Sequence, residues 1–287
     1  MSFSEKRNRV NNNKNPLGFP VRGSLFKNML KDKIQVLADF LGKRDIPQLK
    51  KEELQKKYCF EKADVFVLFG GSIIEGAKVF AQAKQNDAAR YYIIVGGEGH
   101  TTETLRQIVH EKYPKIETAG MPESVVFSRL IKHQYGYEPD AIETASTNCG
   151  NNITNLLALL RKKGIEANSI ILAQDASMQR RMEAGLLKYA PDMTIINYAV
   201  YRAEIGETGG KPYVKNEICG MWEMERYLAL LMGEIPRLLD DENGYGPRGK
   251  DFIAHVDMPK EVLAAYQELK ALLGDKTRQA DSRWASK

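Results

Sequence analysis

Short apolar runs that end in glycine or a polar residue alternate along this chain with segments of helical periodicity. The apolar runs lie at residues 63–71, 91–97, 140–143, 169–174 and 193–200, and the helical segments that follow or separate them lie at 73–85, 102–112, 122–135, 152–163 and 177–189. Regular alternation of strands and helices is typical of a parallel sheet whose crossover helices cover its faces. The sequence therefore predicts an α/β fold, a Rossmann-like parallel sheet of about five strands with helices on both faces.

Further helical segments flank this predicted core. Residues 24–42 and 46–57 precede the first strand, and residues 221–233 and 259–274 follow the last one, joined by a long turn-rich connection. We therefore expect an N-terminal tail and helices packing on the core over residues 1–60, and a Rossmann-like α/β domain over residues 61–215. A C-terminal helical segment with a long loop should occupy residues 216–274, before a flexible tail at 275–287.

The formal net charge of +5 lies in the two tails. Residues 1–16 carry a net +3 and residues 275–287 a net +2, so the body between them is balanced. A nucleic-acid-binding face needs a basic patch, and we expect no nucleic-acid partner. No apolar run reaches the ~18 residues of a membrane helix, and no signal peptide follows the basic N-terminus. With three widely spaced cysteines, the sequence predicts a cytoplasmic protein with reduced thiols and no membrane insertion, and leaves the oligomeric state open.

Polar and glycine-rich motifs follow four of the five apolar runs. In open parallel sheets, ligands bind beyond the carboxyl ends of the strands, so we expect these motifs to line one pocket for a small-molecule ligand. The predicted ligand-binding residues are Gly70, Gly71, Ser72, Gly96, Gly97, Gly99, Thr147, Asn148, Asn152, Gln174 and Arg180. Helix N-termini attract anions, but Thr and Asn also serve as plain N-caps, and both interpretations stay open for Thr147, Asn148 and Asn152. Arg180 is either an anion ligand or a solvated helix side chain.

Glu143, Asp175 and His100 are the candidate catalytic residues, because a carboxylate or imidazole at this rim can orient a hydroxyl or accept a proton. Further carboxylates on the same rim are Glu75, Glu98 and Glu123. No clustered His or Cys predicts a metal site, and neither a complete P-loop nor the G-x-G-x-x-G fingerprint is present.

The long connection before the last helix contains a stacking ring, Tyr245, and a guanidinium, Arg248. We expect residues 240–252 to fold over the strand ends as a lid that contacts a second substrate. The alternative is a plain surface loop.

Four stretches of the chain resemble a known family. They are "GGEGHTT", "STNCGNN", "QDASMQRR" and "GMWEMERYLALLMGEIPRLLDDENGYGPRGKDFIAHVDMP". They are similar to the YdcF-like proteins, an uncharacterised bacterial family that also includes SanA and ElyC, over about residues 60 to 270. The resemblance implies a Rossmann-like fold that binds S-adenosylmethionine, with no established reaction. Relatives usually carry Glu-Asn where Asn151-Asn152 stands here, and no membrane anchor like that of SanA or ElyC is recognised in this sequence.

Residues and resemblance together predict a cytoplasmic S-adenosylmethionine-binding α/β protein, an enzyme of unknown reaction. A methyltransferase should carry an acidic residue before a Gly-x-Gly loop after its first strand, which "LFGGS" does not provide, so binding is better supported than methyl transfer. Two alternatives stay open. One is a nucleotide-ligand sensor or accessory protein without catalysis. The other is a phosphoester hydrolase linked to cell-envelope metabolism that uses Glu143, Asp175 and the glycine loops.

Overall fold

The computed structural model describes residues 24–274 of the chain. Both basic tails, 1–16 and 275–287, lie outside the described residues, and the second of them is the predicted flexible tail.

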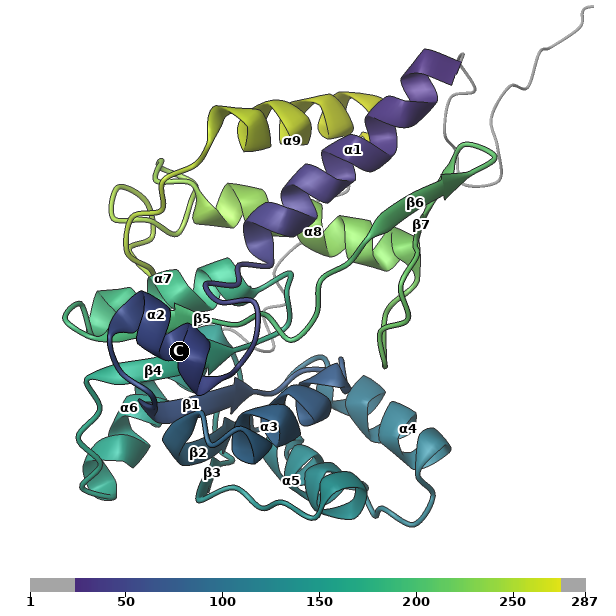
Figure 1. Cartoon of the computed structure of the whole chain (residues 1–287). Coiled ribbons are helices and arrows are strands. Elements are labelled where there is room, and N and C mark those ends of the chain that lie inside the picture. Colours follow the sequence, from purple (N-terminus) through teal and green to yellow (C-terminus); the bar gives the residue numbers. More distant parts are fainter. Residues whose placement is uncertain (1–23, 275–287) are drawn as a thin grey trace, which may run out of the picture.

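A five-stranded parallel sheet forms the centre of the molecule (Figure 1). Its strands are β1 (Ala63–Phe69), β2 (Ala89–Val95), β3 (Ala141–Glu143), β4 (Ser169–Ala173) and β5 (Thr194–Asn197), in the spatial order β3-β2-β1-β4-β5. In the middle of the sheet, Val67 of β1 is in register with Ile93 of β2 on one side and Leu172 of β4 on the other. The predicted α/β class and the number of strands are confirmed.

Helices cover both faces of the sheet because the central strands are apolar on both sides. Phe66 and Leu68 of β1 belong to one core cluster, and Val65, Val67 and Phe69 belong to the other. The first face carries α3 (Glu75–Gln85), α4 (Thr102–Lys112) and α5 (Glu123–Tyr135). The second carries α6 (Cys149–Lys162) and α7 (Gln179–Tyr189). Each fully buried large apolar side chain contributes roughly 1.5–3 kcal/mol to the stability of this arrangement.

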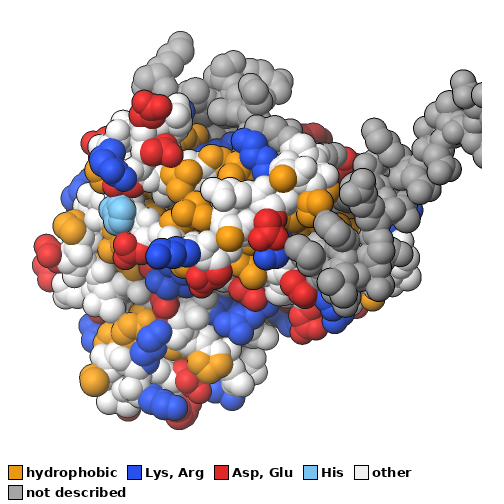
Figure 2. All heavy atoms as spheres, turned by 90° about the horizontal axis from the view of Figure 1, so that it is seen from above, with side chains coloured by type: hydrophobic (Ala, Val, Ile, Leu, Met, Phe, Trp, Pro, Cys, Tyr) orange, Lys and Arg blue, Asp and Glu red, His pale blue; other side chains and the backbone are white. Residues whose placement is uncertain are grey.

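Helices α1 (Ser24–Leu41), α8 (Met224–Leu238) and α9 (Lys260–Leu273) pack together beside the sheet (Figure 1). The short helix α2 (Lys51–Tyr58) lies apart from these three. Leu37 of α1, Leu231 of α8 and Leu269 of α9 share one hydrophobic cluster with the first face of the sheet. The face that carries α1 and α9 shows hydrophobic side chains in its middle, with basic and acidic side chains interspersed (Figure 2). No helix in the described range 24–274 has the length and apolar character needed to span a bilayer.

Three elements differ from the sequence prediction. A hairpin of β6 (Ile205–Thr208) and β7 (Lys211–Val214) was not predicted, because each strand has only four residues. Gly209 and Gly210 form its turn with φ of 60° and 80°, a conformation that glycine adopts readily. α8 continues past Gly233 and Pro236 to Leu238, since Ile235 and Leu238 are fully buried and their packing outweighs the proline. α2 begins five residues later than predicted, at Lys51.

Candidate functional site

The carboxyl ends of β1 and β4 meet at the switch point of the sheet. β1 lies between β2 and β4, and the helices that follow β1 and β4 leave toward opposite faces, which opens a crevice between the two strand ends. Gly70, Gly71 and Ser72 follow β1, and Gln174 and Asp175 follow β4. A small cavity of about 10 Å³ lies here, bordered by Gly71, Gln174 and Asp175 and otherwise by apolar side chains. The switch-point site, as we call it, comprises the residues after the two strands and one glutamate from α5: Gly70, Gly71, Ser72, Gln174, Asp175 and Glu123.

Asp175 is the most unusual residue of the site. Its Oδ1 accepts hydrogen bonds from the backbone N–H and the hydroxyl of Ser177, at 2.8 and 2.7 Å, and from the hydroxyl of Tyr201 at 3.0 Å. Its Oδ2 is buried and has no hydrogen-bond partner among the described residues. Burial raises the pKa of Asp175 to about 6, against the three hydrogen bonds that lower it. A group with this pKa can accept or release a proton near neutral pH.

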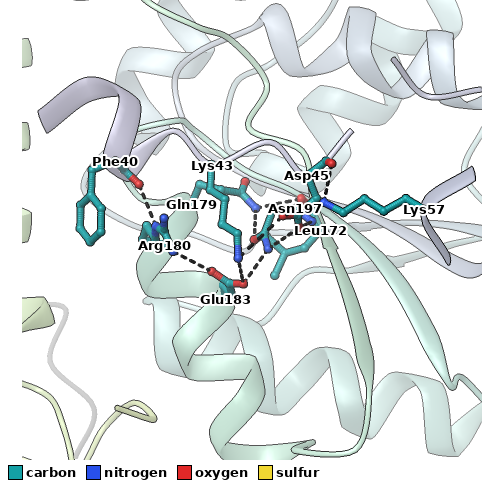
Figure 3. A network of polar contacts seen from close by, with 9 residues as sticks. All are labelled: Phe40, Lys43, Asp45, Lys57, Leu172, Gln179, Arg180, Glu183 and Asn197. Atoms are coloured by element: carbon teal, nitrogen blue, oxygen red, sulfur yellow. Dashed lines mark hydrogen bonds and ion pairs between the residues drawn. The ribbon is translucent and has the colours of Figure 1, made fainter. Parts of the chain in front are cut away.

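A buried amide network fixes the end of β4 and therefore Asp175. The backbone N–H of Gln174 donates to Oε1 of Gln179, and Oε1 of Gln174 accepts from the N–H of Asp175 at 2.7 Å. Gln179 also donates to Oδ1 of Asn197, whose own amide donates to Asp45 (Figure 3). The segment between α1 and α2 thus helps to hold the strand end that carries Asp175.

Glu123 is a second buried carboxyl, at the start of α5. Its Oε1 accepts from the hydroxyls of Thr101 and Thr102, at 2.8 and 2.9 Å. A Cβ on Gly70 would lie 2.5 Å from Oε2 of Glu123, so glycine is required for this close approach. Burial raises the pKa of Glu123 above its ordinary value. Sequence reasoning placed Glu123 on the rim but did not choose it, because its burial follows from the packing of α5 against two strand ends.

The glycines after β2 serve packing. A Cβ on Gly97 would come within 2.2 Å of the carbonyl oxygen of Ser146, so the β3–α6 turn requires glycine here. The N–H of Gly97 donates to Oγ of Ser146 at 3.0 Å, and Gly96 packs against Gly70 and Glu123. The N–H of Gly99 donates to Oγ1 of Thr102 in the turn before α4, where His100 is exposed.

Glu143 and the asparagines stabilise the turn into α6. Oε1 of Glu143 accepts from the N–H groups of Ala145 and Ser146 and from the Asn155 amide. Asn148 is the N-cap of α6, and its Oδ1 accepts from the N–H of Asn151 at 3.0 Å. The side chains thus supply the capping role that sequence reasoning had left open for this stretch. Thr147 donates to the Asn151 amide oxygen, and the N–H of Asn152 donates to the Asn148 carbonyl.

Arg180 is directed away from the strand ends. Its Nε donates to the carbonyl oxygen of Phe40 at 2.8 Å, and its guanidinium lies 4.5 Å from the centre of the Phe40 ring (Figure 3). Arg180 therefore joins α7 to α1, which corrects its assignment as an anion ligand. The side-chain direction was set by α1, a partner distant in sequence.

The long loop before α9 does not cover the strand ends, so the expected lid is a second correction. The loop lies against α7 instead, where the backbone N–H of Ala254 donates to the carbonyl oxygen of Ala184. Arg248 is exposed, with its Nε 3.6 Å from Oδ2 of Asp240, and the Tyr245 ring packs edge-on against Phe252. Asp240 also accepts from the N–H of Arg248, so the loop closes on itself.

Residues 217–222, which we call the strap, cover the turn after β1 instead. Nε1 of Trp222 donates to the buried Oγ of Ser72 at 3.0 Å, and the carbonyl of Cys219 accepts from the N–H of Glu75 at the start of α3. Gly220 has φ of +84°, and a Cβ there would lie 2.9 Å from the Ser72 carbonyl oxygen. Sequence reasoning missed this contact, which joins residues about 150 positions apart.

Within residues 24–274, no cluster of three or more His, Cys, Asp or Glu side chains is arranged to hold a metal ion. No protein-family model matches the chain. The geometry of the switch-point site is therefore the basis for a functional proposal.

Proposed function

We propose that this chain binds S-adenosylmethionine at the switch-point site. The observation that carries the proposal is the buried, unpartnered Oδ2 of Asp175 at the carboxyl end of β4. The residues present fit the group in two respects. First, Oδ2 of Asp175 is a hydrogen-bond acceptor that no donor of the described residues reaches. Second, a Cβ on Gly71 would meet no atom within 4 Å, so there is space beside the backbone of Gly71.

The charge of the site favours a cationic ligand over a phosphoester. Neither Asp175 nor Glu123 forms an ion pair with any other residue of the range 24–274, and the cation that acts on Glu123, Arg106, is already paired with Glu98. S-adenosylmethionine carries a sulfonium and an ammonium, either of which would compensate a buried carboxylate. We therefore set the phosphoester hydrolase below the binding of S-adenosylmethionine.

The resemblance to the YdcF-like proteins supports the same ligand, because two of the similar stretches contain Asp175 and Trp222. When bound, S-adenosylmethionine would supply an electrophilic methyl group. Asp175, with a pKa of about 6, is the best-placed proton acceptor if the protein is an enzyme. A sensor without catalysis would use the same pocket. The three unpaired cysteines suit the reducing cytoplasm in which we place this function.

Binding requires the strap to move. The cavity at the switch point holds about one water molecule, which is far less than the volume of an adenosyl group. Because the strap is anchored on Ser72 and Glu75, its release would free the turn after β1 to move and enlarge the cavity beside Asp175.

Calorimetry with S-adenosylmethionine tests the proposal. Asp175→Asn keeps the shape of the side chain and removes its charge, so we expect it to weaken binding at pH 7.5 by at least tenfold, as for the loss of a buried charge pair. Asp192→Asn removes the same charge from an exposed site and should leave binding unchanged. Absence of binding at millimolar ligand, or equal affinity in parent and Asp175→Asn, would reject the proposal. Conversion to S-adenosylhomocysteine with candidate acceptors separates an enzyme from a sensor.

A further inference from the structure

A second hollow lies away from the switch-point site, between α3 and α5. Its volume is about 260 Å³, and we call it the α3–α5 groove. It is lined by Ile74, Glu75, Ala77, Lys78, Tyr113, Leu130, Gln134, Tyr135, Glu217 and Cys219. This volume is just below the usual range of small-molecule pockets, ~300–1,000 Å³, so the groove suits a ligand of fragment size.

In its closed form, the strap roofs the groove. Residues 217–219 of the strap close one side, where the Cys219 carbonyl accepts from the N–H of Glu75. On the other side, Nζ of Lys112, the last residue of α4, lies 2.8 Å from Sγ of Cys219. Because the roof is anchored to both α3 and α4, the hollow is a built feature of the fold.

The lining combines an apolar floor with aromatic rings and acidic groups. Ile74, Ala77 and Leu130 supply apolar surface, and Tyr113 and Tyr135 supply rings. Burial, followed by the neighbouring Tyr113 and Glu75, raises the pKa of Tyr135, so its ring carries no charge at neutral pH. Neutral phenol rings attract cations over their faces.

The lining of the groove carries two carboxylates and one lysine. Glu75 and Glu217 line it against the single lysine, Lys78, whose Nζ donates to Oε1 of Glu75 at 3.0 Å. Lys78 is more than half exposed, so it can leave Glu75 for water at little cost. Glu217 makes no ion pair with another residue of the described range.

Two lysines stand at the groove, and each contacts a lining residue. Nζ of Lys78 donates to Glu75, and Nζ of Lys112 lies against Sγ of Cys219. The pKa of Lys78 is raised first by its hydrogen bond to Glu75, so this pair stays charged at neutral pH. Glu217 is therefore the lining carboxylate that a ligand ammonium would meet.

We propose that the α3–α5 groove is a second binding site, for a small organic cation that carries an ammonium group on an aromatic or short alkyl body. The body lies on the apolar floor and against the Tyr135 ring, and the ammonium faces Glu217. Because the strap closes one side of the groove, the proposal concerns the protein without a ligand at the switch-point site.

Benzylamine and its neutral isostere benzyl alcohol are the probes. Cys219 lines the groove, so occupancy should slow its alkylation by iodoacetamide, followed by peptide mass spectrometry. Cys59 is exposed elsewhere and serves as an internal control in the same sample. We expect benzylamine at millimolar concentration to protect Cys219 in a saturable manner and to leave Cys59 unprotected, whereas benzyl alcohol should protect much less. Broadening of the benzylamine NMR signals reports binding without the thiol.

Variants locate the site. Tyr135→Leu and Glu217→Gln change exposed side chains, so the fold should be retained, and each should weaken benzylamine binding by about two- to fivefold. Glu138→Gln removes an exposed carboxylate outside the groove and should have no effect. Equal binding of benzylamine and benzyl alcohol would overturn the proposal. So would undiminished benzylamine binding in both groove variants, or no binding by NMR at millimolar concentration.

Discussion

Asp175 lies at the switch point of the sheet, where burial disfavours the ionised form of its carboxyl. Its pKa of about 6, compared with an ordinary value of 3.8, corresponds to a cost of about 3 kcal/mol for the ionised side chain in the ligand-free protein. Tyr201, Tyr227 and Glu234 face this carboxyl, and none of them offers a positive charge. A cost of this size at a strand end is typical of a functional residue.

The first prediction concerns stability and pH. Because the folded-state pKa of Asp175 is raised, the folded chain binds more protons than the unfolded chain between pH 3.8 and 6, and this residue's contribution to stability falls as pH rises. Asp175→Asn removes that dependence. The free energy of unfolding of the variant relative to the parent should therefore improve by about 1.5 kcal/mol from pH 5 to pH 8, measured in urea. A difference that does not change with pH would show that Asp175 titrates normally.

Sequence position identified Asp175 but could not rank the carboxylates around it. Asp175 and Glu143 both lie at strand ends, yet the Glu143 carboxylate accepts hydrogen bonds from the N–H groups of its own turn, which only the folded chain reveals. Arg180 was misassigned for a related reason, because its partner Phe40 is 140 residues away. Hydrogen-bond partners distant in sequence decide which polar side chains are left for a ligand.

Among the elements, the strap contacts the turn after β1, and our proposal requires it to move for the ligand to bind. Trp222→Phe keeps a smaller aromatic side chain and removes the N–H that donates to Ser72, a loss of about 1 kcal/mol from the hydrogen bond. The open form should then be about fivefold more populated, and S-adenosylmethionine should associate faster by a similar factor in stopped-flow measurements. Trp284→Phe, outside the described residues, is the matched control. A slower association in Trp222→Phe would mean that the strap helps to bind the ligand.

A buried charge cluster joins α7 to α8. Glu234 accepts from Nε of Arg181 at 2.6 Å and from Arg237 at 2.9 Å, and its side chain is 3% exposed. Glu234→Gln would leave two largely buried guanidinium groups without their carboxylate, so we expect a loss of about 3 kcal/mol in the free energy of unfolding. Glu138→Gln, at an exposed pair, should leave the urea midpoint unchanged. A loss below about 1 kcal/mol in Glu234→Gln would show that water compensates the arginines.

The sheet elements followed from the sequence because each buried strand is a short apolar run with a glycine or polar residue after it. The β6–β7 hairpin carried a signal as well, Gly209-Gly210, but its strands are too short for periodicity to show. The strap could not be predicted at all. Its place depends on one tryptophan reaching the turn after β1, and no local pattern encodes that contact.

At the scale of the whole molecule, the outer helices complete the site. Tyr201 lies after β5 and its hydroxyl donates to Asp175, while its ring lies 6.3 Å from that of Tyr227 in α8. α8 in turn shares one core with α1, α9 and the first face of the sheet. The predicted N-terminal, central and C-terminal segments follow one another along the chain, but a single hydrophobic cluster contains residues from all three.

The pH dependence of S-adenosylmethionine binding tests the central claim most directly. If the ligand's positive charge meets the ionised Asp175, whose pKa is about 6 in the free protein, the association constant should rise about tenfold between pH 5 and pH 7. Glu123 also has a raised pKa, so Glu123→Gln is measured in parallel with Asp175→Asn, and only the latter should flatten the profile. In calorimetry across this range, we expect the association constant to rise steeply with pH in the parent and to stay low and constant in Asp175→Asn. Equal, pH-independent affinity in both proteins would contradict the assignment of Asp175 as the group that holds the ligand.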